Sequence, residues 1–378
     1  MSKREGLTRR DLLKGSGGLI AAIGMMAATP GRLLAAAPMT VGFIYEGTKN
    51  DFGWNQSFAV AAQKIAKEDG VKLVEQENVA ETADVERVME SMIQLDGAKV
   101  LFASSFGYWP FILKLAPKYK DVLFVHAGGL WKEGDPANVI SYRGYMEEPH
   151  YLCGIAAGMM TKSNKIGFVG PKPLYFIFNN CNGFTLGARS VNPKVTSLFV
   201  LTGDWANPVK DAEAVNSLVD QGCDVIISDS DAPKVSIETA ERRGVMSCGY
   251  HTNLSSLAPK GFITGAEWDW ADRGAAFVKA WQTGGKFPHL VVGGFKQRLV
   301  AISPFGPNVP PAVKSAVEKA RAGFIADTLK LYKGPLKDNE GHVVLKPGEV
   351  IDNEDSKFKT AVNFLVEGTQ GKTGLEKK

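Results

Sequence analysis

Aromatic rings and carboxylates recur where apolar segments of this 378-residue chain end. They lie in segments 45–54, 104–108, 204–205, 229–231, 249–251 and 267–270. Rings on two sides of a cleft can stack on a flat ligand, and carboxylates between them can accept hydrogen bonds from its N–H or O–H groups. The pattern therefore predicts noncovalent binding of a flat molecule that carries hydrogen-bond donors. A phosphate ligand would need clustered Arg or Lys, which these segments lack.

No arrangement typical of covalent or metal chemistry stands out. The sequence has no GxSxG, HExxH or Walker motif, and no GxGxxG between an expected strand and helix. The five histidines are scattered singly, and only His251 follows a strand closely enough to reach a cleft. We therefore expect no catalytic residue, no metal site and no cofactor.

The four cysteines lack the C-x-x-C spacing of metal ligands; they are Cys153, Cys181, Cys223 and Cys248. Their even number permits disulfides in an oxidising compartment, and Cys223 and Cys248 fall near the ends of neighbouring expected strands. Spacing alone does not show the close approach that a disulfide requires. Free buried cysteines are therefore the favoured interpretation.

The first strand, loop and helix show how the chain could position these groups. A short apolar run from Val41 ends at Gly47, which is typical of a strand buried in a parallel sheet. Asn50 and Asp51 can cap the helix that follows, and Gly53 allows a tight backbone in the loop. Ligands of open parallel sheets bind beyond the carboxyl ends of the strands, so this loop should face a ligand.

Strand and helix patterns then alternate through two similar blocks. The first block has strands at 72–75, 100–103 and 122–126 and helices at 82–95 and 108–118. After a crossing region at 128–145, the second has helices at 149–161, 184–190, 210–221 and 232–243 and strands at 165–169, 196–201, 224–228 and 245–248. Repeated βαβ units predict an α/β fold with two doubly wound parallel-sheet lobes and right-handed crossovers.

The rest of the chain is expected to return toward the first lobe. It has strand patterns at 262–265 and around Val291 and Leu299, helix patterns at 270–283, 311–326 and 357–366, and a hairpin at 334–350. We predict lobe 1 at 38–145, lobe 2 at 146–265, and crossing segments with a C-terminal extension at 266–378. Lobes joined by more than one crossing form a hinge that closes on a ligand.

The first 37 residues are typical of an export signal. Residues 8–14, TRRDLLK, form a twin-arginine motif, and an apolar segment and Ala35–Ala37 follow. The apolar segment, at about fourteen residues, is shorter than a membrane-spanning helix, although a basic tail or membrane anchor is the alternative. No cysteine follows it that could carry a lipid. We expect a periplasmic protein, cleaved near residue 37.

Removal of this segment changes the charge of the chain. Of 44 basic and 40 acidic residues, the first 37 hold six and two, which leaves 38 of each. A neutral mature chain gives no support for binding to nucleic acid or to a membrane surface. Its length, about 340 residues, exceeds what one hydrophobic core usually organises, so two domains are expected.

Several stretches together resemble the basic membrane protein family of transport binding proteins, similar to the purine nucleoside receptor lipoproteins. They are GFIYEGTKNDFGWNQ, ENVAETADVERVMESM, SSFGYWP, EEPHYLCGIAAGMM, GARSVNP, TGDWANPVKDAEAVNSLVDQGCDVII and GGFKQRLVAISPF. The resemblance covers nearly all of the mature chain and implies a fold like periplasmic binding proteins of type I. It further implies a monomeric solute-binding protein that captures a purine base or nucleoside and delivers it to the permease of an ABC importer.

The resemblance also implies a set of ligand contacts. They are Tyr45, Phe52, Trp54, Ser105, Phe106 and Tyr108 from lobe 1, and Glu148, Trp205, Asp231, Gly249, Trp268, Asp269 and Lys296 from lobe 2 and the crossings. Residues 251–253 (His, Thr, Asn) depart from the family pattern, in which many members carry an acidic residue. This departure weakens the case for ribose recognition.

Two other functions remain open. A periplasmic sensor subunit would have the same fold and ligand, and genomic neighbours would separate it from an importer component. An exported nucleoside hydrolase would need a loop rich in D-x-D pairs to bind Ca²⁺, and the chain shows none.

Overall fold

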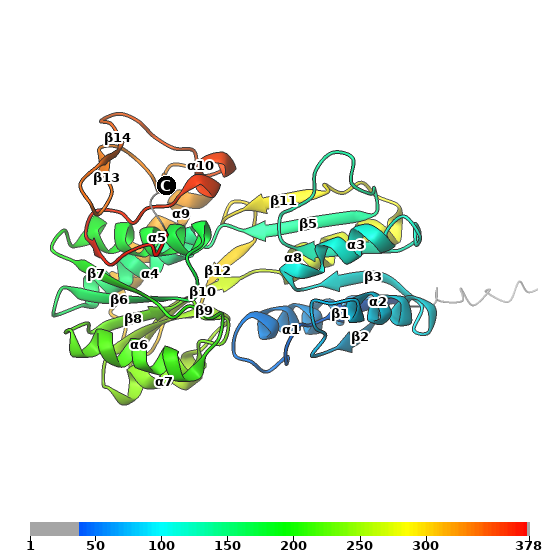
Figure 1. Cartoon of the computed structure of the whole chain (residues 1–378), viewed down its shortest axis with the longest axis horizontal. Helices are drawn as coiled ribbons and strands as arrows, with labels where there is room; N and C mark the ends of the chain where they lie inside the picture. Colours follow the sequence, from blue (N-terminus) through cyan, green and yellow to red (C-terminus); the bar gives the residue numbers. More distant parts are fainter. Residues whose placement is uncertain (1–37, 376–378) are drawn as a thin grey trace, which may run out of the picture. The chain divides into compact units, whose positions relative to one another are not determined.

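The computed structural model describes residues 38–375. The predicted export signal and its cleavage site therefore lie outside the described residues. Within 38–375, two mostly parallel sheets each have helices on both faces (Figure 1). No helix in this part of the chain is long and apolar enough to cross a membrane.

The first sheet has the strand order β11-β5-β4-β3-β1-β2. Its strands are all parallel and comprise β1 (Met39–Ile44), β2 (Val71–Gln76), β3 (Ala98–Ala103), β4 (Leu123–Ala127), β5 (Val139–Gly144) and β11 (Leu290–Gly293). Side chains of β1 alternate between the two faces, as a buried strand requires: Val41 and Phe43 pack on one face and Ile44 on the other.

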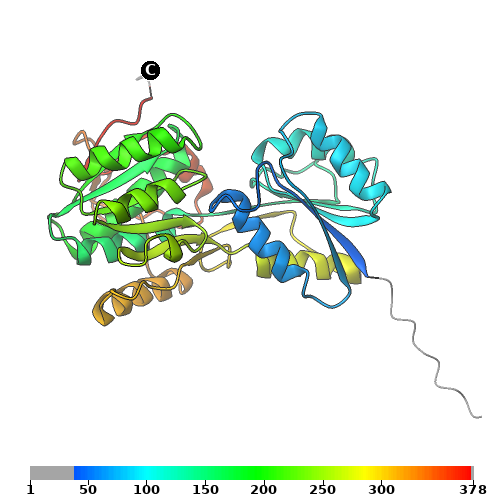
Figure 2. The ribbon, with the colours of Figure 1, turned by 90° about the horizontal axis from the view of Figure 1, so that it is seen from below.

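Helices cover both faces of this sheet (Figure 2). One face packs on α1 (Trp54–Ile65) and α8 (Ala271–Thr283), and the other on α2 (Asp84–Gln94) and α3 (Trp109–Leu115), which follows the 3₁₀ turn η1 (Phe106–Tyr108). The loops after β1 and β3, which precede α1 and η1, contain predicted ligand contacts of lobe 1.

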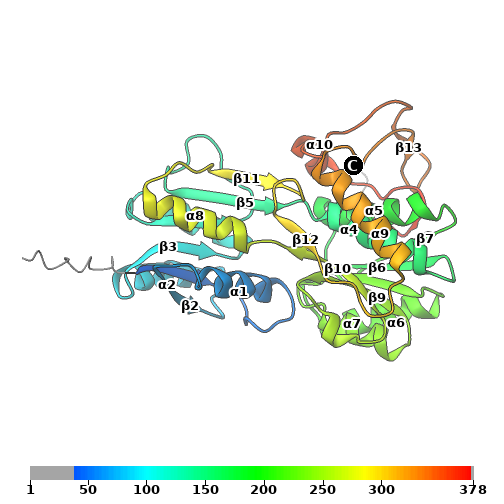
Figure 3. The same ribbon diagram turned by 180° about the vertical axis from the view of Figure 1, so that it is seen from behind.

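The second sheet has the order β12-β10-β9-β8-β6-β7-β15, with β12 antiparallel to β10. Its strands are β6 (Lys165–Gly170), β7 (Thr196–Leu201), β8 (Val225–Ser228), β9 (Met246–His251), β10 (Phe262–Trp268), β12 (Val300–Ile302) and β15 (Thr369–Gln370). One face packs on α6 (Pro208–Asp220) and α7 (Lys234–Arg242). The other packs on α4 (Glu147–Met160) and α5 (Tyr175–Val191), and α9 (Pro311–Ile325) lies against α4 (Figure 3).

Helices α4 and α5 approach each other very closely. A Cβ atom added at Gly154 would lie 2.1 Å from the carbonyl oxygen of Phe184, and one at Gly187 would lie 2.0 Å from that of Tyr151. Glycine is therefore required at both positions, because the backbones leave no room for a side chain.

Three segments connect the two sheets. They run from β5 to α4 (144–147), from β10 to α8 (268–271) and from β11 to β12 (293–300), and are called here the first, second and third crossings. Beyond α9, the chain forms the antiparallel pair β13 (Leu336–Lys337) and β14 (Val343–Leu345), the short helix α10 (Ser356–Ala361) and the edge strand β15.

The predicted α/β fold class with two doubly wound sheets is confirmed. The hairpin at 334–350 is confirmed, and the cysteines of the described chain are free and buried, as the favoured interpretation had it. The lobe boundaries at residues 145 and 265 stay predictions.

Four elements differ from those predicted. The region 128–145 contains β5, helix α5 begins at Tyr175 rather than at residue 184, helix α10 ends at Ala361 rather than at residue 366, and β15 was not predicted. The start of α5 contains Asn179, Asn180 and Asn182, which are poor helix formers on their own. Tertiary contacts of these buried amides, such as Asn182 Nδ2 to the carbonyl of Phe364 (3.1 Å), stabilise the helix instead.

Candidate functional site

The loop after β1 contacts the loop after β8, which belongs to the other sheet. The backbone N–H of Trp54 donates to the carbonyl of Asp231 at 3.1 Å. A Cβ atom at Gly53 would lie 1.8 Å from that same oxygen, so the contact requires glycine. The carboxylate of Asp51 accepts from the N–H groups of Gly53 (2.8 Å) and Asn55 (3.0 Å), so it pairs an N–H of the first turn of α1 although the N-cap residue is Gly53 rather than Asn50 or Asp51.

Four aromatic side chains meet beside this contact. The ring centroid of Trp54 lies 5.6 Å from that of Trp268 and 5.8 Å from that of His251, both with edge-to-face geometry. Trp268 also stacks on Trp270 at 4.5 Å. The structure thus brings the predicted contacts Trp54 and Trp268 together and adds His251, which lies at the end of β9.

A cavity of about 160 Å³ adjoins this cluster. Its lining comes from α1, from the end of β9, and from the second crossing and β12: Ser57, Val60, Lys64, His251, Thr252, Glu267, Trp268, Asp269 and Ala301. Burial raises the pKa of both Glu267 and Asp269. Two predicted ligand contacts, Trp268 and Asp269, thus line the same cavity.

The tautomer of His251 follows from its partner. The indole N–H of Trp268 can only donate, and it donates to Nδ1 of His251 at 2.8 Å. The imidazole proton must then lie on Nε2, which is 3.6 Å from Oδ1 of Asp231 and has no hydrogen-bond partner among residues 38–375. His251 is buried and has a left-handed backbone (φ 71°), an unusual conformation for a residue other than glycine. It therefore holds an N–H donor beside a carboxylate.

The loop after β3 lies against two carboxylates. The hydroxyl of Ser105 contacts Glu46 (3.0 Å) and Glu81, and Glu81 also accepts from the N–H of Gly107 at 2.7 Å. Burial raises the pKa of Glu46, and the charges of Glu81 and Asp231 add to this effect. Phe106, another predicted contact, is 54% exposed.

A second pair of rings lies at the start of α5 and in the loop after β7. Trp205 is 36% exposed and lies parallel to Phe176, with an interplanar angle of 1° and ring centroids 6.1 Å apart. The guanidinium of Arg143 lies 4.4 Å from the centroid of Phe176, and the ammonium of Lys172 lies 5.2 Å from that of Trp205. Each of these two cations therefore already has an aromatic partner within the protein. The N–H of Asp231 donates to the carbonyl of Trp205 at 2.8 Å, which connects this pair to the contact at Trp54.

Two predicted contacts have their side chains in the core of the first sheet. The hydroxyl of Tyr45 donates to Glu75 at 2.8 Å, and that of Tyr108 donates to the carbonyl of Val79 at 2.5 Å. Both rings are fully buried, and burial raises the pKa of both hydroxyls. Both side chains already have partners within the protein.

Three further predicted contacts are dispersed. Gly249 is buried within β9, and the ring of Phe52 lies under the ammonium of Lys234 at 4.9 Å. Lys296 lies on the third crossing, where its ammonium pairs with Glu354 at 3.1 Å. The part of these residues in ligand binding stays a prediction.

Glu148 lies at the start of α4, where it connects two crossings. Its carboxylate accepts from the N–H of Phe295 at 2.9 Å. Burial raises its pKa to about 7, against the opposing effect of Lys359. The side chain therefore joins the first crossing to the third.

Glu46, Arg143 and Phe176 were not among the predicted site residues. Glu46 could have been found, because it is a carboxylate directly after a strand. Arg143 was missed because β5 was taken as part of a crossing, and Phe176 because α5 was expected to begin at residue 184.

Comparison with known proteins identifies the family. Residues 39–325 match the family of ABC transporter substrate-binding proteins described as PnrA-like. The chain belongs to this family. PnrA-like proteins are substrate-binding components of ABC transporters rather than a class of enzymes, and such proteins typically act in the periplasm or outside the cell.

Two relatives and one solved structure extend this finding. A purine-binding protein of Brucella abortus is 33% identical over 89% of this chain and 95% of its own. A putative ABC transporter glucose-binding protein of Haloferax volcanii is 30% identical over 87% of this chain and 80% of its own. An ABC transporter solute-binding protein from Conexibacter woesei shares the fold, with a TM-score of 0.66, 22% identity, and coverage of 78% of this chain and 98% of its own.

Proposed function

We propose that this PnrA-like protein captures a purine base or nucleoside between its two sheets and delivers it to an ABC permease. The protein would act as a monomer and perform no chemistry on the ligand. The observation that carries the proposal is the grouping of tryptophan rings with paired donors and acceptors where loops of the two sheets meet. The similarity to a purine-binding protein over nearly the whole mature chain supports it.

Each part of the grouping has a role in this proposal. Trp54, Trp205 and Phe176 supply faces on which a base can stack. Asp231 and Glu46 accept hydrogen bonds from ring or amino N–H groups of the ligand. Both carboxylates retain access to water in the structure, so a ligand that buries them without supplying a donor would lose about 1 to 3 kcal/mol for each group.

The proposed ligand contacts include the full predicted set. Those nearest the contact between the loops are Trp54, Trp205, Asp231, Trp268 and Asp269, and the others are Tyr45, Phe52, Ser105, Phe106, Tyr108, Glu148, Gly249 and Lys296. The core positions of the Tyr45 and Tyr108 rings favour an indirect part for both, in which they hold the loops that carry the contacts.

A sugar is the second candidate ligand. The similarity to a putative glucose-binding protein favours it, and carboxylates beside aromatic rings also suit sugar hydroxyls. The partly exposed ring of Trp205 favours a purine instead, because a flat base can stack on it face to face and a sugar has no π-system. A sensor subunit would bind the same ligand and differ only in its partner.

Thermal melting against a panel of purine bases, nucleosides, glucose and amino acids tests the proposal. A ligand at a hundredfold excess over its Kd stabilises the folded protein by about 2.7 kcal/mol. We expect the largest rise in Tm with a purine. A clear rise with glucose and none with any purine would replace the purine with the sugar. Native mass spectrometry of the purified protein would identify a retained ligand independently.

We also propose export by the twin-arginine pathway. The motif at residues 8–14 supports it, and the family is typically found outside the cytoplasm. Replacing Arg9 and Arg10 with Lys should retain the precursor in the cytoplasm. Unchanged export of that variant would contradict the pathway but not the binding function.

A further inference from the structure

The C-terminal segment 326–375 lies beyond the part of the chain that matches the family, yet it is firmly packed on the second sheet. Its anchor is a set of buried amides on α5. The side chain of Asn182 donates to the carbonyl of Phe364 (3.1 Å) and accepts from the N–H of Val366 (2.9 Å). The hydroxyl of Tyr332 donates to Asn179 at 2.8 Å. These hydrogen bonds to α5 fix the position of α10.

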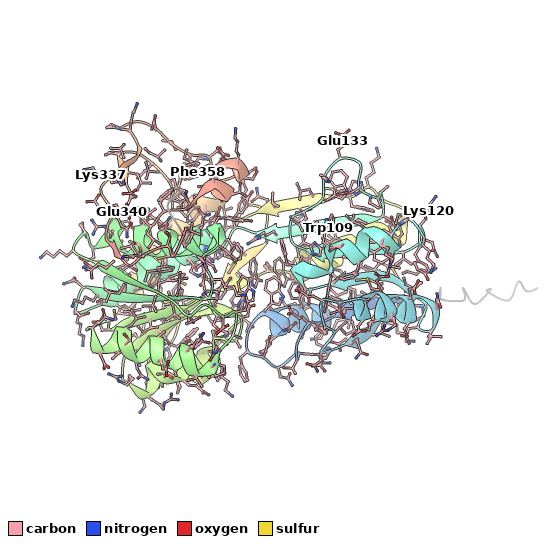
Figure 4. All side chains as sticks on the ribbon, in the orientation of Figure 1. Trp109, Lys120, Glu133, Lys337, Glu340 and Phe358 are labelled. Atoms are coloured by element: carbon pink, nitrogen blue, oxygen red, sulfur yellow. The ribbon has the colours of Figure 1, made fainter. Side chains whose placement is uncertain are left out.

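Helix α10 places one lysine on the first crossing. The ammonium of Lys359 lies 2.5 Å from Oε1 of Glu147 and 3.4 Å from the ring centroid of Tyr145. Lys359 is 6% exposed and Glu147 is 4% exposed. Phe358, labelled in Figure 4, packs on Tyr332 at 5.1 Å between ring centroids and holds the adjacent turn of the helix.

The same segment also contacts the third crossing. Glu354 accepts from the ammonium of Lys296 (3.1 Å) and from the side-chain amide of Gln297 (2.7 Å). The two crossings are themselves joined, because the N–H of Tyr145 donates to the carbonyl of Gly293 at 2.8 Å. Residues 326–375 therefore touch two of the three connections about which the sheets can move.

Loss of the ion pair between Lys359 and Glu147 at the first crossing is costly even if water enters. A buried lysine and glutamate are tolerated only when they neutralise each other, and removal of one leaves an uncompensated charge. Without Lys359, Glu147 would remain buried next to Glu148, which is also buried. A shift of the first crossing that exposes the carboxylate of Glu147 to water would relieve this unpaired charge.

We propose that residues 326–375 act as a strap across the crossings, with Lys359 as the positioning residue that fixes the first crossing. The strap holds the start of α4 in one place relative to the third crossing. It limits the paths along which the two sheets open and close, and so sets the rates at which a ligand enters and leaves. The proposal requires a ligand between the sheets but not a particular one.

Hydrogen exchange of the full-length protein without ligand tests the proposal. Lys359→Met keeps the stem and removes the charge, and Lys359→Arg restores a cation. Lys357→Met changes an exposed lysine of the same helix and serves as the matched control. In Lys359→Met we expect amides of segments 144–150 and 293–299 to exchange about ten- to a hundredfold faster, while β1 and β3 are unchanged. Lys359→Arg should recover most of the protection, and Lys357→Met should match the wild type.

Two outcomes would overturn the proposal. Equal acceleration throughout the chain would show that Lys359 contributes only to global stability, and no acceleration at the crossings would show that the strap does not hold them. Stopped-flow tryptophan fluorescence with adenine gives a second readout in which Lys359→Met should change the dissociation rate. Absence of adenine binding in the wild type would count against the purine proposal and leave the exchange result intact.

Discussion

Trp54 and Trp205 carry the same ring in very different surroundings. Trp54 has its ring centroid 5.0 Å from that of Phe58 and also contacts the rings of Trp268 and Trp270. Trp205 is 36% exposed and stacks on the ring of Phe176, which belongs to a helix packed on the same sheet. A ligand that stacks on both should therefore depend on them in different ways, because one ring also supports the structure.

Replacement of each tryptophan with Ala should separate binding from stability. Trp205→Ala should weaken purine binding by about 1 to 3 kcal/mol, the value of a stacked base, and leave the unliganded Tm nearly unchanged. Trp54→Ala should weaken binding and also lower the free energy of unfolding by about 3 kcal/mol, because it removes packed aromatic contacts. Calorimetric titration and melting curves of both variants measure these effects. Wild-type affinity in Trp205→Ala would place the ligand away from this ring.

Glu148 should make stability depend on pH in a predictable direction. Its pKa is raised from 4.5 to about 7, so the folded protein binds this proton more tightly than the unfolded chain does. The stabilisation by protonated Glu148 is thus fully present below pH 4.5 and is lost as pH rises through 7. Glu148→Gln cannot lose a proton, so its free energy of unfolding relative to wild type should rise by roughly 2 to 3 kcal/mol between pH 4.5 and 8.

Urea denaturation at a series of pH values measures this difference. Glu213→Gln, on the exposed face of α6, provides the control and should show no such trend. A difference between Glu148→Gln and wild type that stays constant with pH would contradict the raised pKa. The same variant also tests binding, since Gln lacks the acceptor-only character of a carboxylate.

At the scale of elements, α4, α5 and β8 meet at one buried polar group. Asp229, directly after β8, accepts from Nδ2 of Asn180 on α5 at 2.7 Å and lies 2.7 Å from Nε2 of His150 on α4. Nδ1 of His150 must donate to the carbonyl of Met146 at 2.7 Å. One proton therefore has to lie between His150 and Asp229, and both groups are fully buried.

Asp229→Ala should strongly destabilise the second sheet and its helices. Alanine removes the acceptor of the Asn180 amide and the partner of the His150 imidazole, so two buried polar groups lose their hydrogen bonds. We expect a loss of about 3 to 5 kcal/mol in the free energy of unfolding, measured by urea denaturation. Asp204→Ala, which removes a partly exposed carboxylate paired with Lys210, should have little effect. Equal losses of unfolding free energy in the two variants would show that burial of Asp229 adds nothing to its contribution to stability.

Elements with local sequence signals could be predicted, and those held by distant contacts could not. The strand at Val41 and the pairing of Asp51 with the first turn of α1 follow from hydrophobic pattern and side-chain chemistry within a few residues. The start of α5 and strand β15 depend on contacts between residues far apart in the sequence, such as Asn182 and Val366, which are 184 positions apart. Pattern within a short window carries no information about such contacts.

The whole molecule sets which predicted site residues meet. Position after a strand placed Trp54 and Asp231 beyond the carboxyl ends of β1 and β8, one strand in each sheet. It could not show that Tyr45 and Tyr108 turn into the core, since side chains of a strand and of the residues after it alternate between faces. Nor could it show that the two sheets touch through Gly53, a contact that no local pattern encodes.

That contact leads to a prediction about closure. Gly53→Ala would place a Cβ atom 1.8 Å from the carbonyl of Asp231, so the loop after β1 must move away and the hydrogen bond from Trp54 must break. The change lies on the surface between the sheets and not within either core, so the unliganded Tm should fall little. Affinity for a purine should fall at least tenfold, because closure would bring the two loops into collision and the stacked ring would lose one side.

Gly285→Ala, where the added atom meets only ordinary contacts of 3.4 Å or more, is the matched control. Calorimetric titration gives the affinities, and small-angle scattering with saturating ligand should show a larger radius of gyration for Gly53→Ala than for wild type or control. Equal affinity and equal radius in all three proteins would mean that the sheets close on the ligand without this contact.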